Sequence, residues 1–154
     1  MARRLEPIRK SVKETLEDIL AGEREAATGG PTAVVKYLSR VFAGQANLPL
    51  AVRSLAYDRL AEAQAQLQAW EACAASVDLA IQHLPDMATE FPHTYREMLS
   101  QLTCFERGIQ AHSQLGQFEQ ALALAEQTVA LELGAHYAAK RDSLAWAQRT
   151  APGR

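Results

Sequence analysis

The sequence has little of what builds β-sheets, disulfide frameworks or membrane spans. Its 154 residues include only two cysteines, Cys73 and Cys104, too few for a disulfide framework. No run of about 18 apolar residues occurs, so no transmembrane helix is expected. Valine, isoleucine and threonine do not cluster, and apolar and polar residues never alternate over a sustained stretch, which excludes most β-rich folds.

Neither sign of charge is in large excess. The formal net charge is −2, so no global positive field would hold nucleic acid or an anionic membrane. The first seven residues lack the long apolar run of a secretion signal, and we therefore expect a cytoplasmic protein. Arginine outnumbers lysine twelve to four and alanine occurs 29 times, a composition that favours a GC-rich bacterial source.

Motifs for catalysis and cofactor binding are also missing. The histidines and cysteines form no H-x-x-x-H, H-E-x-x-H or C-x-x-C spacing, and no nucleophile elbow, P-loop or dinucleotide-binding glycine motif occurs. His83, Asp86, Glu90, His93 and Cys104 could gather near one loop, but histidines at the surface or at helix ends are the simpler expectation. We predict no enzyme activity, no cofactor and no metal site.

Strong helix formers are abundant instead. Glycine and proline fall between segments of helical length, and apolar residues within those segments recur at intervals of three and four. Seven helices are expected, over residues 7–27, 31–43, 49–67, 69–84, 92–115, 117–133 and 135–148, with an irregular stretch at 86–91. The short connections predict antiparallel neighbours, and hence an all-α stack of helical hairpins.

One pattern occurs twice along the chain. Its first copy has Tyr57, Leu60, Ala61, Trp70, Cys73, Val77, Ala80 and Pro85, and its second has Phe105, Gly108, Ile109, Phe118, Ala121, Ala125 and Thr128. In each copy one aromatic residue follows another after thirteen residues, and small or β-branched residues come next at intervals of three or four. This pattern resembles the tetratricopeptide repeat, whose helix pairs follow W-x₂-L-G-x₂-Y…A-x₃-F…P.

The resemblance covers about half of the chain and implies a helix-hairpin repeat. Small residues such as Ala61 and Cys73 would let the two helices of a hairpin approach closely, and the aromatic residues would fill the space between hairpins. The two copies are 48 residues apart, whereas the standard period is about 34. Residues 86–103 hold the surplus, which we expect to lengthen the fifth helix and to add a linker. Leu133 stands where the second copy would have its proline.

The pattern divides the chain into three parts. Residues 1–47 are predicted to form an amphipathic helical hairpin without a clear repeat motif. Residues 48–149 are predicted to form the repeats, with the last helix capping the stack. Residues 150–154 are expected to be a disordered tail.

By resemblance to the family, the first helix of each repeat lines a concave groove. The groove residues predicted to contact a partner are Asp58, Glu62, Gln66, Glu106, Gln110 and Gln114. Residues 60–95 hold five carboxylates and no lysine or arginine, so the groove is expected to be acidic and polar. The lysine and asparagine clamp of the best-known family members is absent from these positions. The predicted function is therefore a protein–protein interaction module for a basic or polar segment.

The N-terminal charges leave two alternatives open. Arg3, Arg4, Arg9, Lys10 and Lys13 precede an acidic second half of the first predicted helix. Two such helices paired antiparallel would match their charges, which would make a homodimer. An accessory factor that binds nucleic acid through this basic cluster is less favoured, because the cluster is small and has no interleaved aromatic residues.

Overall fold

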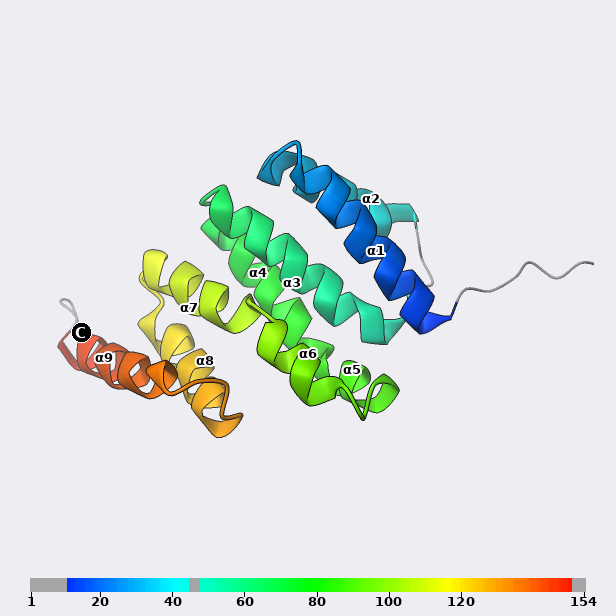
Figure 1. Ribbon diagram of the computed structural model, residues 1–154. Coiled ribbons are helices and arrows are strands. Elements are labelled where there is room, and N and C mark those ends of the chain that lie inside the picture. Colours follow the sequence, from blue (N-terminus) through cyan, green and yellow to red (C-terminus); the bar gives the residue numbers. More distant parts are fainter. Residues whose placement is uncertain (1–10, 45–47, 151–154) are drawn as a thin grey trace, which may run out of the picture.

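The computed structural model describes residues 11–44 and 48–150, and within these residues every regular element is a helix (Figure 1). The all-α prediction is therefore confirmed. The helices of this part of the chain are α1 (Val12–Ala27), α2 (Pro31–Gly44), α3 (Leu50–Gln66), α4 (Trp70–Gln82), α5 (Leu84–Glu90), α6 (Tyr95–Gln101), α7 (Cys104–Gln114), α8 (Phe118–Ala130) and α9 (His136–Thr150). The two short helices, α5 and α6, have seven residues each, and the other seven match the predicted number.

The long helices form a row of antiparallel hairpins, α1–α2, α3–α4 and α7–α8, and α9 closes the row against α8 (Figure 1). Helix α3 lies at the centre and packs against α1 and α2 on one side and against α4, α5 and α7 on the other. Ten of its seventeen residues are buried. A helix buried on most sides needs small and apolar residues all round, which is why α3 is rich in alanine.

The N-terminal hairpin packs on α3 through apolar side chains. Helix α1 begins at Val12 because Ser11 is extended and its hydroxyl accepts a hydrogen bond from the Glu14 amide at 3.1 Å. The predicted start at residue 7 lies outside the described residues. Ile19 of α1 and Leu38 of α2 are buried in one cluster with Val52 of α3. The hairpin is thus continuous with the row rather than a separate body.

The turns of the two central hairpins repeat each other at the predicted interval of 48 residues. The Ala69 amide donates to the Gln64 carbonyl at 2.9 Å, and the Gln117 amide donates to the His112 carbonyl at 2.7 Å. Gln68 and Gly116, each one residue earlier, both have positive φ, of 57° and 72°. Each turn thus ends its helix with the left-handed residue and the six-to-one hydrogen bond of a Schellman motif.

The main core lies between the two central hairpins, and small residues make it dense. The repeat residues whose exposure is 0% are Ala61, Cys73, Val77, Ala80, Ala121, Ala125 and Thr128. A Cβ built on Gly108 would lie 2.6 Å from Val77 Cγ1, so α7 and α4 approach too closely for any side chain there. Both cysteines are free and buried. Trp146 is not a core residue: it is 63% exposed.

Residues 86–103 differ from the prediction. The stretch expected to be irregular forms α5, because Pro85 stands in the first turn of a new helix, where its missing amide hydrogen costs nothing. The single helix predicted over 92–115 is two helices, α6 and α7, separated by an extended Leu102 with ψ of 142°. The surplus residues thus build two extra short helices beside α3.

Candidate interaction surface

Three of the hollows in the described part of the chain contain predicted groove residues or apolar side chains of the row, two of them between α1 and α3 and one between α7 and α9. The hollow that we call the apolar cleft has a volume of about 300 Å³. Its apolar side chains are Leu16, Leu20, Leu55, Phe91 and Met98, and its polar ones are Lys13, Glu17, Arg59, Thr94 and Gln101. Helix α1 forms one side of the cleft, α3 forms its base, and the α5–α6 segment forms the other side. The surplus residues 86–103 therefore supply four of the ten residues that line the cleft, and two of its five apolar side chains.

The second hollow, which we call the polar hollow, lies between α7 and α9. It has a volume of about 490 Å³ and is lined by Glu106, Arg107, Ile109, Gln110, Ser113, Gln114, Lys140, Ser143 and Leu144. Three of the predicted groove residues, Glu106, Gln110 and Gln114, thus share one surface. They were placed together by their spacing of four residues on one helix face.

The third hollow is small, about 110 Å³, and lies where the α1–α2 turn approaches α3. Two predicted groove residues, Glu62 and Gln66, line it together with Arg59 and Glu23. Gln66 donates a hydrogen bond from Nε2 to Glu62 Oε1 at 3.2 Å. The six predicted residues are therefore divided among two hollows and the protein interior.

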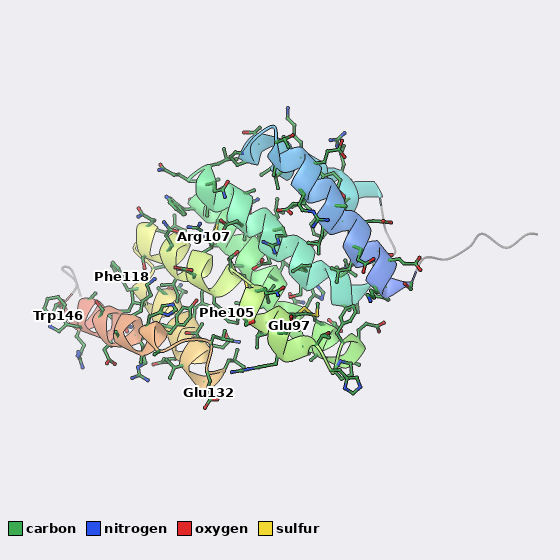
Figure 2. The ribbon with its side chains drawn as sticks, in the orientation of Figure 1. Glu97, Phe105, Arg107, Phe118, Glu132 and Trp146 are labelled. Carbon is green, nitrogen blue, oxygen red and sulfur yellow. The ribbon has the colours of Figure 1, made fainter. Side chains whose placement is uncertain are left out.

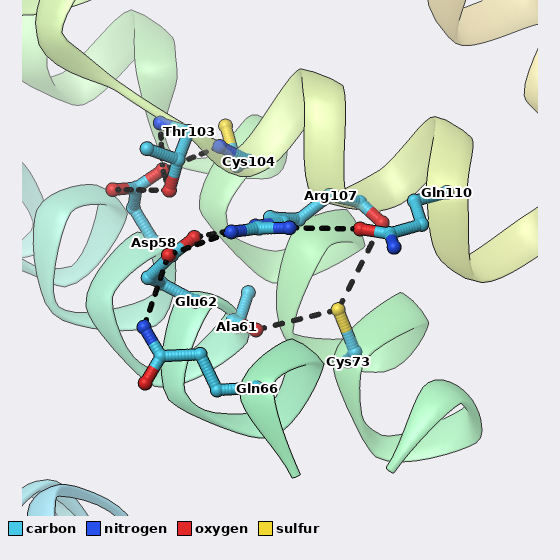
Figure 3. A network of polar contacts seen from close by, with 9 residues as sticks. All are labelled: Asp58, Ala61, Glu62, Gln66, Cys73, Thr103, Cys104, Arg107 and Gln110. Carbon is cyan, nitrogen blue, oxygen red and sulfur yellow. Dashed lines mark hydrogen bonds and ion pairs between the residues drawn. The ribbon is translucent and has the colours of Figure 1, made fainter. Parts of the chain in front are cut away.

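Asp58 is the predicted residue in the interior, and its proposed contact with a partner is wrong. Its exposure is 0%. Its Oδ1 accepts hydrogen bonds from the Thr103 amide at 2.8 Å and from the Cys104 amide at 2.6 Å (Figure 3). These two amides open α7, so a carboxylate on α3 caps a helix 45 residues later in the chain. This cap is the physical reason why the predicted long helix is broken at Leu102 and Thr103.

Burial controls the protonation of Asp58. Loss of water raises the pKa of Asp58 from 3.8 to about 6, although the charge of Arg59 and the hydrogen bonds from the Cys104 and Thr103 amides act to lower it. The group is therefore an ionised cap at neutral pH, and it takes up a proton in mildly acidic solution.

Glu62 ties the same two helices together at the surface. Arg107 Nε donates to Glu62 Oε2 at 2.6 Å and Arg107 Nη2 donates to Glu62 Oε1 at 2.9 Å, a bidentate pair (Figure 3). The hydrogen bond from Arg107 lowers the pKa of Glu62, against the effect of partial burial. Arg107 Nη1 also donates to Gln110 Oε1 at 2.9 Å. Glu62 and Gln110 are thus partly engaged within the protein.

The surface is less acidic than predicted. Arg59 lies between the apolar cleft and the third hollow, and Arg107 and Lys140 line the polar hollow. The acidic pattern of residues 60–95 does not predict these cations, because all three lie outside that range. The signal for Arg107 was present, since it lies three residues before Gln110 and therefore on the same helix face. No spacing pointed to Lys140, which reaches this surface from α9.

Neither thiol is placed for nucleophilic chemistry. Burial raises the pKa of the Cys73 thiol to about 11, and burial together with the Asp58 charge raises the pKa of the Cys104 thiol still further. Cys73 Sγ lies 3.4 Å from the Ala61 carbonyl oxygen, inside the α3–α4 hairpin. Within residues 11–44 and 48–150, no three His, Cys, Asp or Glu side chains gather as metal ligands would.

Two of the histidines are tied into helix ends. His83 Nδ1 lies 3.1 Å from Asp86 Oδ2 at the junction of α4 and α5. His112 Nδ1 lies 2.7 Å from Gln117 Oε1 at the α7–α8 turn. His112 is buried, at 7% exposure, and lies in the last turn of α7, so it is one of the expected histidines at a helix end rather than at the surface.

The basic N-terminal cluster is mostly outside the described residues. Arg3, Arg4, Arg9 and Lys10 belong to that part, and Lys13 lines the apolar cleft. In the described part of the chain, no helix has the length and apolarity needed to cross a membrane.

Comparisons of the chain with protein-family models, with curated proteins and with solved structures find no match.

Proposed function

We propose that this protein is a non-catalytic interaction module that holds a segment of another protein along its row of hollows. The observation that carries the proposal is the apolar cleft, where five apolar side chains from three separate segments surround about 300 Å³ of accessible space. Apolar side chains grouped in an open hollow are the usual anchor of a protein interface, with polar residues around them.

The cleft sets the chemistry of the partner. A bulky aliphatic or aromatic side chain of the partner would enter between Leu16 and Met98, because both line the cleft from opposite sides. Polar groups on either side of that anchor would meet Lys13, Glu17 and Arg59. Since these carry both signs of charge, the partner segment is polar with mixed charge rather than simply basic, which revises the expectation from the sequence.

The repeated turns support the resemblance to the tetratricopeptide repeat as the basis of this module. Stacked helical hairpins present preformed surfaces, and a preformed surface loses little entropy when it binds. We assign the protein no enzymatic activity and no cofactor.

The test is selection of peptides from a phage-displayed library of random 12-residue sequences. We expect the wild type to enrich sequences that share a bulky apolar residue flanked by polar ones. Leu16→Lys and Met98→Lys place a charge on opposite sides of the cleft and should each weaken binding of the enriched peptides at least tenfold. Leu79→Lys is the matched control, because Leu79 is exposed on α4 and lines none of the three hollows.

Two results would contradict the proposal. One is a wild type that enriches no common sequence. The other is a set of enriched peptides that bind Leu16→Lys and Met98→Lys as tightly as the control, with all variants showing the same thermal unfolding as the wild type.

A further inference from the structure

The outward face of α9 carries an exposed tryptophan in a charged setting. Tyr137 and Leu144 are buried toward α8. Asp142, Trp146 and Arg149 lie half a turn away and are all exposed. Among the described residues, Trp146 is the most exposed large apolar side chain, and Figure 2 shows it pointing away from the body of the protein.

The charges beside Trp146 are complementary to those of a second copy of the same helix. Asp142 and Arg149 are seven residues apart, so they lie on one face about two turns from each other, with Trp146 between them. In an antiparallel pair of α9 helices with the twofold axis near residues 145 and 146, each Asp142 meets the partner subunit's Arg149. A parallel pair in register would place like charges together instead.

We propose that the protein forms a homodimer through antiparallel pairing of α9 helices, with the two Trp146 side chains packed at the centre and two Asp142–Arg149 ion pairs beside them. This surface is separate from the apolar cleft and from the N-terminal helix, so the proposal does not depend on the proposed function. The contact is isologous, since the same patch is used by both subunits.

The ion pair that Asp142 already makes with Arg141 does not prevent the proposed contact. Arg141 Nε lies 3.2 Å from Asp142 Oδ1, but the two side chains are 37% and 72% exposed. Exposed pairs of this kind contribute little stability, so the carboxylate exchanges partners readily. A single pair of helices covers less than the roughly 1,200–2,000 Å² of a standard interface, so the dimer is weak and forms at high protein concentration.

The test is sedimentation velocity of the full chain over rising concentration at low ionic strength, where ion pairs are least screened. We expect the wild type to shift from monomer to dimer. Trp146→Ala, Asp142→Arg and Arg149→Asp should each weaken the association about tenfold or more. The double variant Asp142→Arg with Arg149→Asp should dimerise again, and an equimolar mixture of the two single variants should form a heterodimer, because opposite charges then face each other.

The charge swap separates this proposal from other arrangements. The proposal is overturned if the wild type stays monomeric at the highest concentration. It is also overturned if a dimer forms that neither single charge variant weakens, or if the dimer is lost only when the N-terminal helix is removed. Unchanged helicity and thermal unfolding show that a variant is folded, and Lys36→Glu on the exposed face of α2 serves as the charge-reversal control.

Discussion

Helix α3 contacts α1 and α2 at one joint, the N-terminal joint, and α7 at another, the C-terminal joint. The two joints are held by different kinds of interaction. At the N-terminal joint, apolar side chains of α1 and α2 pack on α3, and the rings of Phe42 and Tyr57 stack at 4.3 Å with 19° between their planes. At the C-terminal joint, the packing is accompanied by the Asp58 cap and by the bidentate pair of Glu62 with Arg107.

This difference shows that the relative position of two hairpins can be fixed tightly at one contact and less tightly at another. Apolar contact is non-directional, so it constrains the orientation of the N-terminal hairpin on α3 less than hydrogen bonds would. Hydrogen bonds to a buried carboxylate fix both distance and angle. The apolar cleft lies beside the N-terminal joint, whereas the polar hollow lies beyond the C-terminal joint.

The largest expected effect comes from removing the cap. Asp58→Ala leaves the Thr103 and Cys104 amides without an acceptor, and we expect it to lower the free energy of unfolding by about 2–4 kcal/mol. At pH 4, where the wild-type carboxyl is also mostly protonated, Asp58→Asn keeps an oxygen at the same place and should cost less than about 1 kcal/mol. Urea unfolding followed by circular dichroism measures both. An alanine variant as stable as the asparagine variant would show that the cap does not hold the joint.

The pH dependence of stability should be next in size. The pKa of Asp58 is about 6 in the folded protein and 3.8 as an ordinary value, so the folded state binds a proton more tightly. The contribution of Asp58 to the free energy of unfolding is therefore largest below pH 4. It falls as the pH rises from 4 to 6 and does not change further above pH 6. At about 1.4 kcal/mol per pH unit, the loss reaches about 3 kcal/mol.

Comparison with Asp58→Asn isolates this effect, because the other carboxylates titrate in both proteins. The difference in unfolding free energy between the variant and the wild type should grow between pH 4 and pH 6 in favour of the variant. A difference that stays flat over this range would contradict the raised pKa.

Two glycines allow the packing on the two sides of α3 to be compared by adding one methyl group to each. At the C-terminal side, a Cβ on Gly108 would meet Val77 Cγ1 at 2.6 Å and Leu124 Cδ1 at 2.7 Å. Both neighbours belong to the buried core, and the β-branched Val77 has little freedom to move. We expect Gly108→Ala to lose about 1–2 kcal/mol on thermal unfolding, despite the higher helix propensity of alanine. An unchanged midpoint would mean that α4 and α7 separate easily.

The smallest effect is expected at Gly22 in the N-terminal hairpin. A Cβ there would lie 2.1 Å from the Tyr37 hydroxyl oxygen, but Tyr37 is only half-buried and its ring can swing outward. Gly22→Ala should therefore change stability by no more than about 0.5 kcal/mol, since the gain in helix propensity offsets the displaced ring. A loss as large as that of Gly108→Ala would show that the N-terminal hairpin is packed as tightly as the core.

The sequence patterns predicted local structure well and long-range contacts poorly. The helices, the turn at Gly116 and the small core residues could be predicted, because each depends on neighbours a few residues away. The break between α6 and α7 could not be predicted, because its cause is a side chain on α3. For the same reason Asp58 was predicted to be a groove residue, because nothing local shows that another helix covers it.

The sequence patterns also did not predict the apolar cleft. Two of its apolar side chains, Phe91 and Met98, come from the segment that was expected to be a linker and a helix extension. Their role depends on where α5 and α6 pack, and no periodicity within seven residues fixes that position. The spacing on α7, by contrast, correctly placed Glu106, Gln110 and Gln114 on a common surface.

The cap on α7 also bears on how the chain folds. Asp58 and the amides that it binds are 45 and 46 residues apart, so α7 gains its cap only after a long loop has closed. Arrays of hairpins that touch only their nearest neighbours can unravel one unit at a time. Here the start of one hairpin is completed by a residue of the preceding one, and we therefore expect the two central hairpins to unfold together.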